Sequence, residues 1–349
     1  MIKRIFAQTA GAAVLGLGAA IAASAQTAEF NLKMHHFLSA KTPTHAKFFQ
    51  PWADSIEEAS EGRIKIKIYG SMSLGGKPPQ LVDQVQDGFV DIIWTLPGYT
   101  PGRFPAISAF ENPFMVTDAY ETSQALQAYY EANPEVQNEF ADMHPLAFWT
   151  HDRGVVYSKG DAIDSVADFA GKKIRNPSRP VAAALDALGA TPVGMPVPEM
   201  PQALAKNVID GTVIPFQIVP ALKLHELVDN AVEIQTEDGR GLYTAVFLLG
   251  MNKAKYKSMP ADLQQIMDDH AGMYFAKLGG EFFKNAENYG RKLIDENATR
   301  SHMPAAEVKK MQEATANVPV EWVKEMDGLG LPGQKLLDSA NAMLEKYSK

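Results

Sequence analysis

The sequence predicts an α/β protein of two lobes joined by a long helix. Short apolar runs alternate with helical patterns twice, once over residues 30–94 and again over 146–229. Such alternation is typical of a largely parallel sheet covered by helices, and its repetition favours two lobes over one large sheet. A helical pattern over 260–298 would run ~50 Å at the standard helical rise. Because that length exceeds one lobe, we expect this helix to span both.

The first series reads strand, helix, strand, helix, strand. Its five segments are Phe30 to His36, Thr44 to Ser60, Arg63 to Tyr69, Pro79 to Gly88 and Val90 to Trp94. The run Arg63 to Tyr69 alternates strictly between apolar and polar residues, which predicts a half-exposed strand. The run Val90 to Trp94 is almost continuously apolar, as in a strand that is covered on both faces.

The second series contains shorter elements. They are an apolar run over 146–149, a strand over 155–157, a helical turn over 166–169, a strand over 173–175, two helical patterns, an apolar run closed by Asp210-Gly211, and a segment over 222–229. In the long pattern over 260–298, Gly279-Gly280 is expected to bend the helix or to divide it. Further helices are expected over 304–349.

The N-terminus has the pattern of a signal peptide. Lys3 and Arg4 precede an apolar stretch over 10–22, which is followed by Ala23-Ser24-Ala25, and we expect cleavage after Ala25. The chain contains no cysteine, which excludes disulfides, zinc–thiolate sites and a cysteine nucleophile. These features predict an exported, periplasmic protein held together by core packing.

Charge and motifs exclude several kinds of function. The net charge is −8 and becomes −10 once Lys3 and Arg4 are removed, which argues against nucleic acid or an anionic membrane surface as a partner. Dinucleotide, phosphate-loop, zinc-protease and serine-hydrolase motifs are absent from the sequence. His35 and His36 are adjacent in a predicted strand and therefore face opposite ways. We expect no enzyme, no cofactor and no metal, and an enzyme built on carboxylates stays open as the weaker alternative.

Two arginines follow predicted strands of the second series. Arg175 ends the run Lys173-Ile174-Arg175, and Arg153 follows the apolar run over 146–149. Ligands of α/β proteins bind at the carboxyl ends of strands, and arginine is suited to a carboxylate because its fork donates two parallel hydrogen bonds. We therefore interpret Arg175 and Arg153 as an anion clamp. The alternative is an ordinary ion pair with an aspartate of the same lobe.

An aromatic turn follows the buried strand of the first series. Its sequence is Trp94-Thr95-Leu96-Pro97-Gly98-Tyr99, and the Pro-Gly pair predicts a tight turn. Trp94, Leu96 and Tyr99 could line a ligand site or could simply close the core. Both interpretations remain open at this point.

Six motifs, in this order, resemble a known family. They are Gly62-Arg63-Ile64-Lys65-Ile66 with Leu74-Gly75, Gln84-Val85-Gln86-Asp87-Gly88 with Val90-Asp91, Phe110-Glu111-Asn112-Pro113-Phe114, Asp168-Phe169-Ala170-Gly171-Lys172-Lys173-Ile174-Arg175, Leu188-Gly189-Ala190-Thr191-Pro192 and Val208-Ile209-Asp210-Gly211. Over essentially the whole mature chain, the sequence resembles the solute-binding proteins of tripartite ATP-independent periplasmic (TRAP) transporters, the family of the C4-dicarboxylate-binding component.

The resemblance implies a two-lobed, type II-like periplasmic binding protein that closes on a small organic acid in the cleft between its lobes. It implies delivery of that acid to a small and a large integral-membrane subunit. The family's carboxylate-binding arginine falls on Arg175, and a less constant second arginine falls on Arg153. A binding component of another importer is the alternative.

A departure from the family pattern suggests the kind of ligand. Members that bind polar acids often have asparagine before the proline that follows the Asp-Gly run, and this chain has Ile214 there. A buried ligand hydroxyl without a partner costs roughly 1–3 kcal/mol. We therefore expect an aromatic or branched keto or hydroxy monocarboxylate, with a sugar acid (a uronate) as the alternative. The expected ligand-binding residues are Arg175, Arg153, Trp94, Tyr99, Leu96, His36, Phe37, Phe216, Gln217 and Tyr243.

The expected division of the chain follows from the two series and the long helix. We assign residues 1–25 to the signal peptide, 26–151 plus 241–280 to lobe I, and 152–240 plus 281–349 to lobe II.

Overall fold

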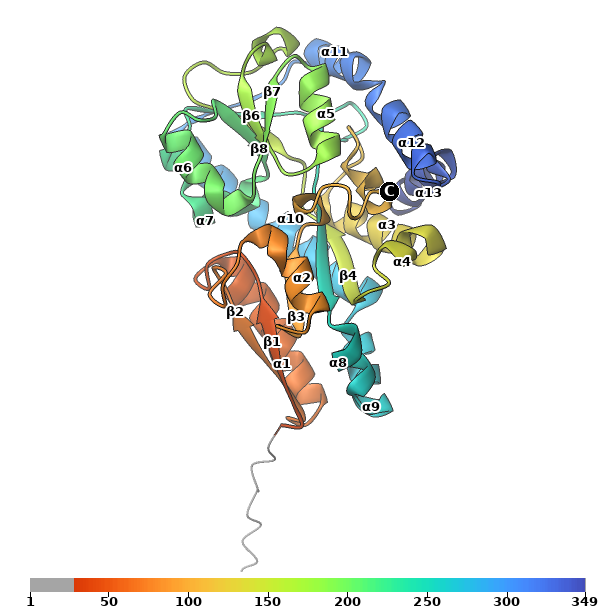
Figure 1. Cartoon of the computed structure of the whole chain (residues 1–349). Helices are drawn as coiled ribbons and strands as arrows, with labels where there is room; N and C mark the ends of the chain where they lie inside the picture. The colour runs from red at the N-terminus through yellow and green to blue at the C-terminus, as the bar shows by residue number, and fades with distance from the viewer. Residues whose placement is uncertain (1–27, 349) are drawn as a thin grey trace, which may run out of the picture.

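The computed structural model describes residues 28–348, which form two α/β lobes, each built on one sheet (Figure 1). The prediction of a two-lobed α/β fold is confirmed. The predicted signal peptide, residues 1–25, lies outside the described residues.

The sheet of lobe I has the strand order β2-β1-β3-β10-β4. Its strands are β1 Phe30–His35, β2 Ile64–Tyr69, β3 Ile92–Thr95, β4 His144–Thr150 and β10 Val246–Met251. β1 runs parallel to β2 and β3, whereas β10 runs antiparallel to β3 and β4. The alternating sequence of β2 gives it alternating burial at the sheet edge, and the apolar β3 is buried throughout, as predicted.

The sheet of lobe II has the order β11-β9-β5-β8-β6-β7. Its strands are β5 Val155–Ser158, β6 Lys173–Asn176, β7 Thr191–Gly194, β8 Gly211–Ile214, β9 Asn230–Glu233 and β11 Thr299–His302. β5 is antiparallel to both β8 and β9, and the other pairs are parallel. β5 and β10, which run antiparallel to their neighbours, each begin directly after a segment in which the chain crosses between the lobes. These crossing segments are 151–154, before β5, and 234–245, before β10.

Helices cover both sheets. They are α1 Gln50–Ala59, α2 Leu81–Gln86, α3 Ala119–Ala132, α4 Pro134–Glu139, α5 Arg179–Ala187, α6 Met200–Ala205, α7 Val219–Leu222, α8 Lys253–Ser258, α9 Ala261–Asp269, α10 Gly272–Asn297, α11 Ala305–Thr315, α12 Val318–Gly328 and α13 Gly333–Tyr347. None of the helices within residues 28–348 combines the length and the apolar character needed to cross a bilayer.

The long helix α10 spans both lobes, as expected. It packs on α3 and β4 in lobe I, and on α7 and the short turn Phe216–Ile218 in lobe II (Figure 1). With 26 residues it is ~39 Å long, shorter than the predicted pattern over 260–298.

The prediction that Gly279-Gly280 divides this helix is wrong, because α10 is continuous through both glycines. The break lies at His270-Ala271, between α9 and α10, where the carbonyl of His270 accepts a hydrogen bond from Trp52 Nε1 at 2.9 Å. The two glycines lie inside α10. A Cβ at Gly280 would come within 2.7 Å of the Ala119 carbonyl oxygen, so this glycine permits close packing of α10 on α3.

The residue boundaries of the two lobes stay a prediction. β10 joins the sheet of lobe I, which supports assigning 241–280 there. Of the C-terminal helices, α11 packs on α5 of lobe II, and α13 packs on α3 of lobe I.

Candidate ligand-binding site

A small cavity lies between the two sheets, at the carboxyl ends of β1, β3, β6 and β8. Its free volume is about 40 Å³. It is lined by Phe37, Leu38, Trp94, Leu96, Tyr99, His151, Arg175, Pro177, Val197, Ile214, Pro215, Gln217, Ile218, Tyr243, Ala245, Phe247 and Phe283. This is the position in which open α/β sheets bind ligands, and both lobes contribute to the walls.

Arg175 is the side chain that most clearly marks this cavity. Although it is permanently charged, it is only 1% exposed. Its Nε donates to the Met195 carbonyl oxygen at 2.9 Å, while its Nη2 is buried without a protein partner within the described residues. An uncompensated buried charge is costly, and a carboxylate against the guanidinium edge would supply both the counter-charge and the acceptor.

The Asp-Gly motif after α6 explains how β6 holds this arginine. Asp210 Oδ2 accepts a hydrogen bond from the Lys173 backbone N–H at 2.8 Å, which ties the start of β6 to the start of β8. A Cβ at Gly211 would lie 2.3 Å from the Tyr157 carbonyl oxygen. Glycine is therefore required for β8 to pair with β5, and β8 in turn pairs with β6 at Arg175–Thr212.

Aromatic side chains form the wall contributed by lobe I. The rings of Phe37 and Trp94 lie 4.7 Å apart between centroids, and Trp94 contacts Phe247 at 5.6 Å. Tyr99 reaches across to lobe II, where its hydroxyl accepts a hydrogen bond from the Val197 backbone N–H at 3.0 Å. The structure thus brings the aromatic turn after β3 into the cavity instead of leaving it only in the core.

The segment after β8 divides between the cavity and the core. Ile214 and Gln217 line the cavity. Phe216 does not: it packs edge-on against Tyr157 at 5.9 Å and lies under the Arg291 guanidinium at 4.8 Å. Of the two residues expected to form an apolar wall here, Ile214 lines the cavity and Phe216 does not.

Gln217 also connects the two lobes. Its Nε2 donates to Thr44 Oγ1 of lobe I at 2.9 Å. The backbone N–H groups of Phe216 and Gln217 donate to the two carboxyl oxygens of Glu287 on α10, at 3.1 and 2.8 Å. Burial raises the pKa of Glu287 well above its ordinary value, the nearby Asp152 raises it further, and the two backbone donors oppose that rise.

Besides Phe216, two further predicted residues lie outside the cavity. Arg153 faces a hollow beside the two segments that cross between the lobes, where its Nη1 donates to the Gly239 carbonyl oxygen at 2.9 Å and its Nε lies 3.4 Å from Asp152. His36 lies behind Trp94, and its Nε2 is 2.9 Å from Nδ1 of His45. Burial lowers the pKa of His36 to about 3, and the neighbouring histidines contribute. The remaining predicted residues, Arg175, Trp94, Tyr99, Leu96, Phe37, Gln217 and Tyr243, all line the cavity.

His151 is a lining residue that the sequence analysis missed. It follows β4, on the crossing into lobe II, and is 3% exposed. Burial lowers the pKa of its ring to about 3, the hydrogen bond to the Asp152 carbonyl opposes this, and the charge of Arg175 adds to it. The signal was its place directly after a strand, the same signal that indicated Arg175.

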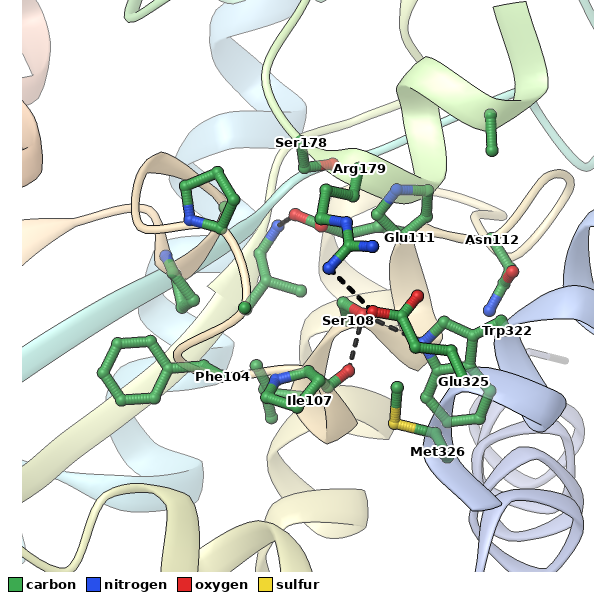
Figure 2. Close-up of a pocket in the computed structure, with 18 of the residues that line it drawn as sticks. Phe104, Ile107, Ser108, Glu111, Asn112, Ser178, Arg179, Trp322, Glu325 and Met326 are labelled. Carbon is green, nitrogen blue, oxygen red and sulfur yellow. Dashed lines mark hydrogen bonds and ion pairs between the residues drawn. The ribbon is translucent and has the colours of Figure 1, made fainter. Parts of the chain in front are cut away.

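A second hollow, of about 170 Å³, lies at the edge of the contact between lobes, beside α5 and α12 (Figure 2). Its arginine already has a partner, because Arg179 pairs with Glu325 at 2.7 Å, and its tryptophan Trp322 donates through Nε1 to Ser108 Oγ at 3.0 Å. Because this hollow offers no unpaired cation, the smaller cavity at Arg175 is the better candidate for an anion. Within residues 28–348, no group of three or more acidic or histidine side chains is placed to hold a metal ion.

Comparison with known proteins identifies the family. The model of the bacterial extracellular solute-binding proteins, family 7 (DctP), matches residues 34–325. The chain belongs to this family. The resemblance seen in its motifs is thereby confirmed, and the family is a substrate-binding component of transport systems and not a family of enzymes.

Curated and solved relatives agree. The C4-dicarboxylate-binding periplasmic protein DctP of Rhodobacter capsulatus is 25% identical over 316 residues, 90% of this chain and 91% of that protein. A marine metagenome TRAP solute-binding protein, described as specific for aromatic acid ligands and solved with 3-hydroxybenzoate, is 43% identical, with a TM-score of 0.89 over 93% of this chain and 100% of that chain. A TRAP solute-binding protein from Rhodoferax ferrireducens T118, solved with copurified benzoate, is 41% identical, with a TM-score of 0.88 over 91% and 98%.

Proposed function

We propose that this TRAP solute-binding protein captures a small aromatic carboxylate. The observation that carries the proposal is Arg175, a buried cation with an unpartnered Nη2 in a cavity whose other walls are mainly aromatic and aliphatic. Its fork would hold the carboxylate by two charge-assisted hydrogen bonds, each contributing ~1.5–3 kcal/mol. The ring would lie among Trp94, Phe37 and Phe247.

The two similar structures support the aromatic class, because one was solved with 3-hydroxybenzoate and the other with benzoate. The chemistry of the walls argues against the uronate alternative. A sugar acid carries several hydroxyl groups, and each one left without a partner costs roughly 1–3 kcal/mol, while Ile214, Leu96 and Ile218 offer none.

Binding is proposed to act through closure of the lobes. Tyr99 to Val197 and Gln217 to Thr44 are hydrogen bonds from one lobe to the other, and a ligand between Arg175 and the aromatic wall would add contacts to both lobes. A ligand shifts the population toward the form that it binds better. The closed, loaded protein would then deliver the acid to the small and large membrane subunits in the periplasm, after removal of residues 1–25.

A thermal-shift and calorimetry screen of the purified protein tests the ligand class. The panel contains benzoate, 3-hydroxybenzoate, 4-methyl-2-oxopentanoate and glucuronate. We expect the aromatic acids to stabilise the protein, by about 2.7 kcal/mol at a concentration 100 times Kd. Stabilisation by glucuronate, with none by the aromatic acids, would refute the assignment. Recovery of the bound acid unchanged, by mass spectrometry, checks that capture proceeds without chemistry.

A further inference from the structure

We propose that the cavity selects aromatic acids whose ring carries a hydrogen-bond donor, a phenolic hydroxyl above all, and that Nε2 of His151 accepts this hydrogen bond. The inference rests on the proposed function, because it concerns the end of the ligand away from the carboxylate.

The hydrogen bond of Nδ1 fixes the tautomer of His151. Nδ1 lies 2.5 Å from the Asp152 carbonyl oxygen, and a carbonyl oxygen only accepts, so Nδ1 carries the proton. In a neutral imidazole the other nitrogen is then an acceptor. The ring is neutral at physiological pH because burial lowers its pKa to about 3 and the charge of Arg175 lowers it further.

The ring of His151 is also held in place. Thr244 Oγ1 donates to the His151 carbonyl oxygen at 2.8 Å. The ring lies 5.1 Å from that of Tyr243 and 5.9 Å from that of Phe247, and both neighbours line the cavity. No protein donor within residues 28–348 is assigned to Nε2, so this ring presents a fixed acceptor on the cavity wall.

Most other polar atoms of the walls are less suited to this role. The Tyr243 hydroxyl donates its proton to the Val213 carbonyl oxygen at 2.9 Å, and its oxygen, although it keeps lone pairs, is a weaker acceptor than a neutral imidazole nitrogen. Trp94 Nε1, which is buried without a partner in the described structure, can only donate. Arg175 is likewise a donor only and is suited to the carboxylate.

Gln217 is the competing acceptor, through its carbonyl oxygen. Its amide group is engaged with Thr44 in the contact between the lobes, so its position depends on lobe closure. His151 is instead fixed by bonds to its own neighbours in the crossing segment, and we therefore assign the acceptor role to His151.

The ligand that fits has two polar ends of different kinds. Its carboxylate meets the donors of Arg175, and its ring donor meets the lone pair of His151. An acid without a ring donor would leave that buried acceptor unpaired, which lowers affinity. The marine metagenome relative was solved with 3-hydroxybenzoate and with metahydroxyphenylacetate, two acids of this kind.

Calorimetry at pH 7.5 with three matched benzoates tests the proposal. The probes are benzoate, the tighter of 3- and 4-hydroxybenzoate, and the fluorobenzoate substituted at the same position, since fluorine is small and cannot donate. We expect the wild type to bind the hydroxybenzoate at least fivefold more tightly than the other two. In His151→Phe, the three affinities should fall within twofold of one another, because the acceptor that distinguishes the three acids is gone.

His270→Phe is the matched control. His270 Nδ1 also bonds a backbone carbonyl, that of Ile266 at 2.8 Å, but the residue lies at the end of α9, outside the cavity lining, so the preference should persist. The assignment of His151 is overturned if His151→Phe still prefers the hydroxybenzoate over the other two acids. It is also overturned if this preference is lost in Gln217→Met and not in His151→Phe. If His151→Phe does not fold, equal wild-type affinities for the hydroxy and fluoro acids overturn the proposal. Failure of every benzoate to bind would instead contradict the proposed function.

Discussion

Arg175 and Arg153 both follow strands of the second half of the chain, yet their surroundings differ. Arg175 is 1% exposed and its Nη2 has no partner in the described structure, whereas the side chain of Arg153 is 32% exposed and is engaged with Asp152 and Gly239. The first has unused hydrogen-bonding capacity facing a closed cavity. The second joins the two segments that cross between lobes. A position at a strand end does not by itself separate a candidate anion site from a structural contact. Burial and an unpartnered donor are what set Arg175 apart from Arg153.

Replacing Arg175 by alanine should lower ligand affinity more than any other change at these two arginines. Loss of a buried charged partner costs about 2–5 kcal/mol or more, so affinity for benzoate should fall roughly 30-fold or more. The ligand-free variant should be at least as stable as the wild type, because an uncompensated buried charge is removed. Calorimetry and thermal unfolding check both points. Arg153→Ala is the matched control, and equal losses in the two variants would contradict the contrast.

Replacing Arg175 by lysine should have the next largest effect. The charge is kept but the two parallel hydrogen bonds are not. We expect affinity for benzoate to fall roughly 10-fold, about 1.4 kcal/mol, clearly less than in the alanine variant. An affinity equal to that of the wild type would show that charge alone holds the ligand.

Gln217→Ala tests whether contacts between lobes contribute to affinity. The variant loses the bond to Thr44, worth about 1 kcal/mol, so titration should show a roughly 5-fold weaker Kd. Gln265→Ala, which removes a bond to Asp269 on the surface of α9, serves as the control and should leave Kd unchanged. A Kd for Gln217→Ala equal to that of the control would exclude a role in closure.

Arg153→Ala should change affinity least, by no more than about twofold, and should act on stability instead, by about 1–2 kcal/mol. Burial raises the pKa of Asp152 and the charge of Arg153 lowers it, so the variant should raise that pKa further. When the pKa of a carboxyl group is higher in the folded than in the unfolded protein, the free energy of unfolding falls as the pH rises through the folded-state pKa. Denaturant unfolding should therefore show a larger deficit at pH 7.5 than at about pH 4.5. A deficit that does not grow with pH would contradict this account.

The elements with strong periodicity were the predictable ones. The alternation of β2, the apolar run of β3 and the motif Lys173-Ile174-Arg175 each report a local contact pattern. The break in the long helix was misplaced because Gly279-Gly280 reads locally as a weak point, while α3 packs directly against it. Arg153 was predicted to line the cavity, but His151 lines it, and this error also arose because the sequence shows only local patterns. Which of two neighbouring side chains faces the cavity depends on how the chain crosses between lobes.

The two α/β lobes, the spanning helix, the family and the arginine at the carboxyl end of β6 were all predictable from the sequence. Each is encoded in residues close together in the chain. Three side-chain positions became visible only in the folded protein: Phe216 turns into the core, Arg153 lies beside the crossing segments and His151 lines the cavity. The cavity wall is assembled from two sheets, two crossing segments and α10, so the direction of each side chain is set by packing between segments far apart in sequence.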